Sequence, residues 1–180
     1  MNRHEVGDAL RFLKSEGIER VMFNRFNIGG RGISHSSRLL PDREGLRRAF
    51  LEADSTARDE GLRITSNVCT PLCVLNPIEF RSIAFSACTP DPTRRPLTID
   101  ARGNLRFCNH SPVVMGNIFD TPFERILGSD YAAAWESTIP AECNECVLWA
   151  RCLGGCRAAA EQLGEGLDQP DPIMRHTGRL

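Results

Sequence analysis

The chain has 180 residues, of which 41% are hydrophobic and 25% are charged, and its net charge is −1. This composition is typical of a globular protein that forms one domain or two small ones. A near-neutral chain lacks the basic surface that binds phosphate groups, so we expect no nucleic-acid partner. No apolar run reaches the length of a membrane span and residues 1–10 lack a signal-peptide core, so we predict no membrane contact and a cytoplasmic location.

Residues 1–68 contain no cysteine and show alternating helix and strand patterns. Periodic apolar side chains predict a helix over 6–16, a strand over 18–23 and a second strand over 62–68. A second helix is expected between a capping Asp42 and a terminating Gly61. Short links between such units favour parallel strands with crossover helices, which is an α/β architecture. Two units are too few for a closed barrel.

Residues 69–165 are less regular, and residues 69–156 carry all eight cysteines. A hairpin is expected over 95–108, with Gly103 in its turn. The run from Thr121 to Glu124 matches a capping box and predicts a helix that continues toward Trp135. A short helix is predicted over 157–163, and a tail over 166–180 that is loose from Gln169. We therefore divide the chain into three segments: an α/β segment over 1–68, a cysteine-rich segment over 69–165 and a tail over 166–180.

The densest cysteine run is Cys143-x2-Cys146-x5-Cys152-x3-Cys156. Thiolates this close together on tight turns can converge on an iron–sulfur cluster or a soft metal ion. Zinc sites also use thiolates, although zinc ribbons usually separate two cysteine pairs by more residues. Spacing alone leaves iron–sulfur binding, zinc binding and redox or structural thiols as alternatives.

Upstream, the spacing Cys88-x14-Gly103-x4-Cys108 completes a pattern that resembles the SPASM domain. SPASM domains hold auxiliary [4Fe–4S] clusters at the C-terminus of radical S-adenosylmethionine enzymes. The surrounding runs 98–108, 116–118 and 152–157 agree with this resemblance. Residues 1–68, including the run 25–32, are similar to the last helix–strand units of the partial (β/α)6 barrel of those enzymes. The resemblance is nearest to the PQQ-biosynthesis-like branch that modifies peptides. It implies the end of that barrel, followed by a small, irregular α+β SPASM domain with a β-hairpin and cysteine-rich loops.

The resemblance also implies which cysteines share a cluster. Cluster I receives Cys88, Cys108, Cys156 and either Cys73 or, as the alternative, Cys69. Cluster II receives Cys143, Cys146 and Cys152. The family's usual fourth ligand to cluster II is a later cysteine, and none follows Cys156. The alternatives for this fourth position are Asp171, His176, an exogenous ligand or an open site, unless cluster II is labile or absent.

Cleavage of S-adenosylmethionine requires a CX3CX2C loop, and this chain lacks one. Cys69-x3-Cys73 supplies only the first spacing, and Asn76 stands where the third cysteine is needed. We therefore expect S-adenosylmethionine to bind only after an N-terminal radical SAM half or a partner chain completes the barrel.

In that assembly the family resemblance assigns cofactor binding to Asn27, Gly29, Gly30 and Asn67. It implies a peptide substrate and an electron donor such as ferredoxin or flavodoxin. The alternative functions are a zinc-binding structural or interaction module without catalysis, and a non-functional truncated gene product.

Overall fold

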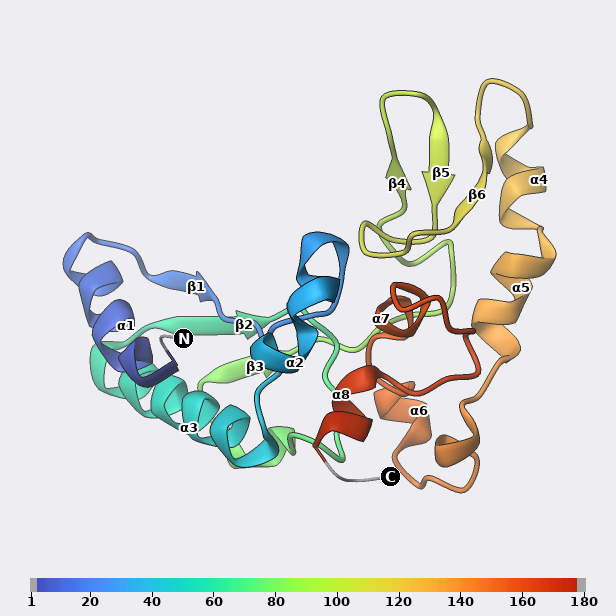
Figure 1. Ribbon diagram of the computed structural model, residues 1–180. Helices are drawn as coiled ribbons and strands as arrows, with labels where there is room; N and C mark the ends of the chain where they lie inside the picture. Colours follow the sequence, from blue (N-terminus) through green and yellow to red (C-terminus); the bar gives the residue numbers. More distant parts are fainter. Residues whose placement is uncertain (1–2, 178–180) are drawn as a thin grey trace.

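The computed structural model describes residues 3–177, which form an α/β part and a cysteine-rich part lying side by side (Figure 1). The helices and strands of the α/β part are α1 (Val6–Ser15), β1 (Arg20–Met22), α2 (Ser36–Leu39), α3 (Arg43–Glu60), β2 (Arg63–Ser66) and β3 (Ile83–Phe85). Three short 3-10 turns accompany them: η1 (Arg3–Glu5), η2 (Gly30–His35) and η3 (Pro77–Glu79). The structure is therefore a mixture of helix and strand, in agreement with the predicted α/β class.

The cysteine-rich part contains shorter elements. They are β4 (Thr98–Ile99), β5 (Asn104–Arg106), β6 (Val114–Asn117), α4 (Phe123–Leu127), α5 (Asp130–Ser137), η4 (Ala141–Cys143), α6 (Trp149–Cys152), α7 (Arg157–Glu161) and α8 (Pro172–His176). Within residues 3–177, no helix combines the length and the apolar composition needed to cross a bilayer.

The three strands of the α/β part form a parallel sheet in the order β1-β2-β3. This confirms the predicted strands over 18–23 and 62–68 and their parallel direction. The predicted capping of the second helix is also confirmed, because Asp42 accepts a hydrogen bond from the Gly45 amide at 2.6 Å. The third strand, β3, follows residue 68, so the sheet takes a strand from the segment that we predicted to belong to the second domain.

The core of the α/β part lies between α3 and the sheet. The apolar face of α3 includes Phe50, which is 1% exposed and contacts the rings of Phe23, Phe80 and Phe85. This packing follows from the 3.6-residue periodicity of α3, which turns its apolar side chains toward one face.

The same core reaches the end of the chain, because α8 is packed against it through Ile173 and Met174. The expectation of a loose segment from Gln169 is therefore wrong for residues 169–177, and residues 178–180 lie outside the described part of the chain. Pro172 begins α8, and the side chain of Asp171 caps it by accepting a hydrogen bond from the Ile173 amide at 3.1 Å. A capped helix with two buried apolar side chains is held in place despite its short length.

The cysteine-rich part contains an antiparallel sheet in the order β4-β5-β6, and Gly103 has a φ of 81° in the first turn. The predicted hairpin is therefore confirmed. The predicted helix toward Trp135 is divided into α4 and α5, and Thr121 does not cap either of them. Gly128 ends the first helix and Ser129 caps the second, because glycine is a poor helix former and serine a good cap.

Candidate iron–sulfur sites

All eight cysteines are thiols on loops or element ends near the junction of the two parts. Cys69 and Cys73 lie on the loop after β2, Cys88 follows β3, and Cys108 follows β5. The remaining four lie in η4, in the turn after it, at the end of α6 and before α7: Cys143, Cys146, Cys152 and Cys156. The fold therefore brings cysteines from the first half of the chain close to those of the run 143–156.

The structure brings four cysteines together as set A: Cys69, Cys88, Cys108 and Cys156. Arg25 joins the Cys69 carbonyl to Asp171, which accepts from the Cys156 amide. The neighbouring Cys88 thiol and burial raise the pKa of Cys69. Burial raises the pKa of both Cys156 and Cys108, with smaller contributions from a charge at Cys108 to the first and at Cys88 to the second. Three of the four also pack against the small core around Phe107 and Trp135. Set A is therefore one neighbourhood of four thiols.

Donors surround the sulfur atoms of set A. The Asn27 side chain donates to Cys156 Sγ at 3.2 Å, and the Ser111 amide donates to Cys108 Sγ at 3.3 Å. Arg95 lies 3.7 Å from Cys88 Sγ, and together with the hydrogen bond from Cys69 it lowers the pKa of Cys88 to about 6. Such donors stabilise negative charge on sulfur, as the thiolate ligands of a cluster require.

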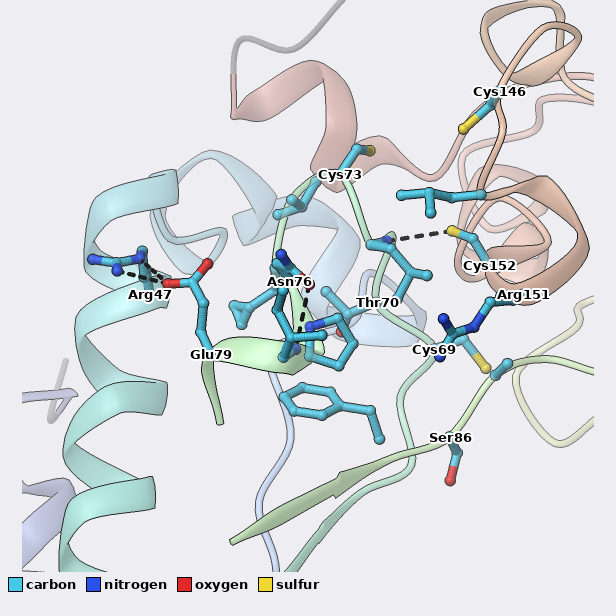
Figure 2. A pocket seen from close by; sticks show the side chains of 18 of the residues that line it. Arg47, Cys69, Thr70, Cys73, Asn76, Glu79, Ser86, Cys146, Arg151 and Cys152 are labelled. Atoms are coloured by element: carbon cyan, nitrogen blue, oxygen red, sulfur yellow. Dashed lines mark hydrogen bonds and ion pairs between the residues drawn. The ribbon is translucent and has the colours of Figure 1, made fainter. Parts of the chain in front are cut away.

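A second set of four, set B, consists of Cys73, Cys143, Cys146 and Cys152. All four line one cavity of about 140 Å³, which Trp149 and Met174 also border. Burial raises the pKa of Cys143 to about 11, and charges at Cys152, Cys146 and Cys73 contribute to this shift. The amide of Leu72 donates to Cys152 Sγ at 3.3 Å, which places the loop carrying Cys73 beside α6 (Figure 2).

Cys152 and Cys156 fall in different sets although only three residues separate them. Leu153, Gly154 and Gly155 have φ values of 54°, 78° and 82°, three left-handed residues in succession. Such a turn reverses the chain between the two cysteines. A Cβ atom at Gly155 would lie 2.6 Å from Pro71 Cγ and 2.7 Å from Asp171 Oδ2, so only glycine fits there.

A buried ion pair between Arg25 and Asp171 fixes the junction around set A. Both side chains are 1% exposed. Arg25 also donates to the Cys69 carbonyl at 3.0 Å, and Asp171 accepts from the Cys156 amide at 2.8 Å. Burial raises the pKa of Asp171, while the Arg25 charge and these hydrogen bonds oppose that rise. The pair thus holds the backbone at two cysteines of one set.

The residues predicted to bind S-adenosylmethionine contact other protein groups here. Asn27 donates to Cys156, the ring of His110 lies against Gly29, and the Gly30 amide donates to the Gln162 side chain at 3.2 Å. The Asn67 amide donates to Asn24 Oδ1 at 2.8 Å. The glycine-rich loop therefore joins the α/β part to the cysteine-rich part, and its role toward a cofactor stays a prediction.

Both predicted non-cysteine ligands of cluster II lie on or next to α8. Asp171 is fully engaged with Arg25 and two amides, whereas His176 is exposed at the end of the helix. Neither borders the 140 Å³ cavity, whose wall includes only Met174 from this helix. The structure thus does not bring them together with Cys143, Cys146 and Cys152.

Iron–sulfur clusters are held by thiolates, and sets A and B supply four each, so the donor chemistry fits. The sulfur donors around set A fit as well, because N–H groups to thiolates are a recurring feature of cluster sites. Within residues 3–177 no group of three or more His, Cys, Asp or Glu side chains is arranged around a single ion. Set B is therefore defined by its shared cavity, and set A by its shared core and by the Arg25–Asp171 pair that joins Cys69 to Cys156.

One comparison with known proteins gives a result. Residues 88–147 match the family model SPASM, an iron–sulfur cluster-binding domain. The matched segment contains two cysteines of set A, Cys88 and Cys108, and two of set B, Cys143 and Cys146. It therefore indicates an iron–sulfur cluster-binding domain over these residues. No curated protein and no solved structure matches the chain.

Sequence reasoning missed three participants: Arg25, Arg95 and the amide group of Asn27 as a donor to sulfur. Arginines are frequent in this chain and most lie on its surface, so nothing local distinguishes these two. The glycine-rich run 27–32 did point to Asn27, although for a different ligand.

Proposed function

We propose that this chain binds two iron–sulfur clusters and serves as the auxiliary-cluster portion of a radical SAM enzyme that modifies a peptide or peptide-derived substrate. The observation that carries the proposal is the sorting of eight thiols into two neighbourhoods, combined with the SPASM match. Set A supplies a complete ligand group of four cysteines to the first cluster. Cys143, Cys146 and Cys152 bind the second.

Clusters of this kind, once bound, transfer single electrons at a potential that thiolate hydrogen bonds and burial adjust. The residues of this chain prepare the first site for that role. Asn27, Ser111 and Arg95 direct donors at three of its sulfur atoms, and the stacked rings of Phe107 and Trp135 exclude water beside it. Arg157 lies over the rings of both Trp135 and Trp149, so a cation sits between the two sets.

The open edge of the parallel sheet supports completion of the α/β part by a further segment or chain. β1 is an edge strand, and the neighbouring Met22, Ile18 and Phe12 are exposed, Met22 by 60%. Unpaired strand edges with apolar neighbours are where another strand adds. The remaining radical SAM barrel strands, with their CX3CX2C loop, are the partner that we propose for this edge.

A larger cleft supports the proposal of a peptide substrate. It encloses about 1180 Å³ between η3 and the turn that carries Cys146. Its wall includes Cys73, Cys146 and Cys152 of set B and Cys69 of set A (Figure 2). Exposed apolar side chains, Ile78 and Val147, stand at this wall beside Arg47 and Arg151. An extended peptide with apolar side chains suits such a lining.

Anaerobic purification with analysis of iron, acid-labile sulfide and zinc tests cluster binding. Two [4Fe–4S] clusters predict about eight iron and about eight sulfide per chain, with an electron paramagnetic resonance signal after reduction. Cys88→Ala and Cys143→Ala should each retain about half of the iron, and the double variant almost none.

Zinc at a stoichiometric level without sulfide would refute this function and favour the zinc module, since four thiolates also suit zinc. A partner strand on β1 is tested separately, by adding the CX3CX2C-containing segment encoded nearest to this chain and measuring complex formation.

A further inference from the structure

We infer that Cys73 is the fourth ligand of the second cluster, so that set B binds it with four cysteine thiolates and leaves no iron position open. This inference rests on the proposed function and deepens it. The ligand comes from the loop after β2, upstream of the other three in the sequence, rather than from a residue beyond Cys156. On ligation each of the four thiols loses its proton and its sulfur binds one iron.

The first observation behind this inference is the position of Cys73. It borders the 140 Å³ cavity together with the other three cysteines of set B. Its sulfur and that of Cys146 point toward one another across the cleft (Figure 2). Leu72, the residue before it, donates its amide to Cys152 Sγ at 3.3 Å, so the backbone next to Cys73 is already joined to the second site.

The loop holds Cys73 in this place through the backbone on both sides. The Val74 and Leu75 amides donate to the Pro71 carbonyl at 2.9 and 3.1 Å, which forms a tight turn with Cys73 at its tip. Arg43 of α3 donates to the Cys73 carbonyl at 3.1 Å. Cys73 packs against the core around Phe50, to which Cys143 also belongs, whereas three cysteines of set A pack against the core around Phe107.

The two residues that the sequence offered for this position fit it less well. Both carboxylate oxygens of Asp171 are occupied, one by Arg25 and the Cys156 amide and the other by the Ile173 amide. His176 is exposed on α8 and does not border the cavity. The sequence had also offered Cys73 to the first cluster, but it is the Cys69 backbone that Arg25 and Asp171 join to Cys156.

Two consequences follow for the second cluster. With four thiolates it has no free iron to bind a substrate directly, so its role is limited to electron transfer and structure. It also links the loop after β2 to the segment 143–152, so its iron–sulfur bonds cross-link the α/β part to the cysteine-rich part.

Single and paired substitutions in the full chain test the assignment of Cys73 to the second cluster. The measurements are the iron and sulfide content and the electron paramagnetic resonance spectrum of the reduced protein. Cys73→Ala should keep about half of the wild-type iron, and so should its control Cys69→Ala on the same loop, with the complementary spectrum. Cys73→Ala combined with Cys146→Ala should still keep that half, because both serve one cluster. Cys69→Ala combined with Cys146→Ala should lose nearly all iron.

Near-complete loss of iron in the Cys73/Cys146 double variant would overturn the inference, because Cys73 would then belong to the first cluster. Full wild-type iron in Cys73→Ala would overturn it as well. Cys73→Ser covers poor folding of the alanine variant: it should alter the signal of one cluster only, and an unchanged spectrum would contradict the assignment. A wild-type chain without sulfide would instead refute cluster binding itself.

Discussion

The α/β part and the cysteine-rich part of this chain are stabilised in different ways. In the former, α3 spans Arg43–Glu60 and buries a row of apolar side chains against a sheet. In the latter, the longest helix is Asp130–Ser137 and the apolar core is a small group around Phe107 and Trp135. Short elements with a small core rarely fold alone, and metal ligation commonly supplies the missing stability. We therefore expect cluster binding to matter more for the folding of the cysteine-rich part than for that of the α/β part.

The largest expected effect comes from removing the clusters with a chelator under oxidising conditions. Amides of β5 and α5 should lose more than roughly a hundredfold of their protection against hydrogen exchange, because metal ligation contributes most of that region's stability. Amides of α3 should keep most of theirs. Hydrogen exchange with mass spectrometry measures both regions in one sample. Equal loss in α3 and β5 would show that the parts fold as one unit.

Phe50→Ala tests how much the apolar core stabilises the α/β part. Loss of this buried ring from the α3 core should reduce the free energy of unfolding by about 3–5 kcal/mol. Phe12→Ala, on a ring that is 63% exposed, is the matched control and should change it by less than about 0.5 kcal/mol. Urea denaturation followed by far-ultraviolet circular dichroism measures both. A small effect at Phe50 would contradict the view that apolar burial against α3 stabilises the α/β part.

The junction between the parts depends on Arg25 and Asp171. Arg25→Met leaves a buried carboxylate without its partner and should cost about 3–5 kcal/mol, whereas Arg25→Met with Asp171→Leu should recover much of that loss. Arg175→Met removes a partly exposed ion pair to Glu165, with 2.6 Å between the charged atoms, and should cost less than about 1 kcal/mol. Thermal unfolding of the four proteins gives the comparison. No recovery in the double variant would assign Arg25 a role beyond charge pairing.

The smallest effect is expected at Asn27. Asn27→Ala removes the donor to Cys156 Sγ and should cost about 1 kcal/mol or less. It should also lower the reduction potential of the first cluster, because the hydrogen bond favours the more negative, reduced state. Asn144→Ala, at an exposed position next to Cys143, is the control and should leave that potential unchanged. A redox titration followed by electron paramagnetic resonance decides, and an unchanged potential in Asn27→Ala would remove Asn27 from the site.

Much of the fold was predictable because it is encoded locally. The apolar period of α3, its cap at Asp42 and the turn at Gly103 each depend on a few neighbouring residues, and all three are present in the structure. The division of α4 from α5 was missed because a capping-box pattern at Thr121 masked the break at Gly128. The packing of α8 was missed because a short polar segment becomes ordered only through distant partners.

The cysteine spacing by itself indicated a thiolate-rich site of the SPASM kind, because four of the cysteines fall within residues 143–156 and two more lie at matching distances upstream. Only the tertiary structure decided which thiols are neighbours. The left-handed turn at 153–155 sends Cys152 and Cys156 to different sets, and the loop after β2 places Cys69 in one set and Cys73 in the other. Spacing in the sequence cannot reveal which cysteines share a set, because the set depends on tertiary contacts that fold the chain back between neighbouring cysteines.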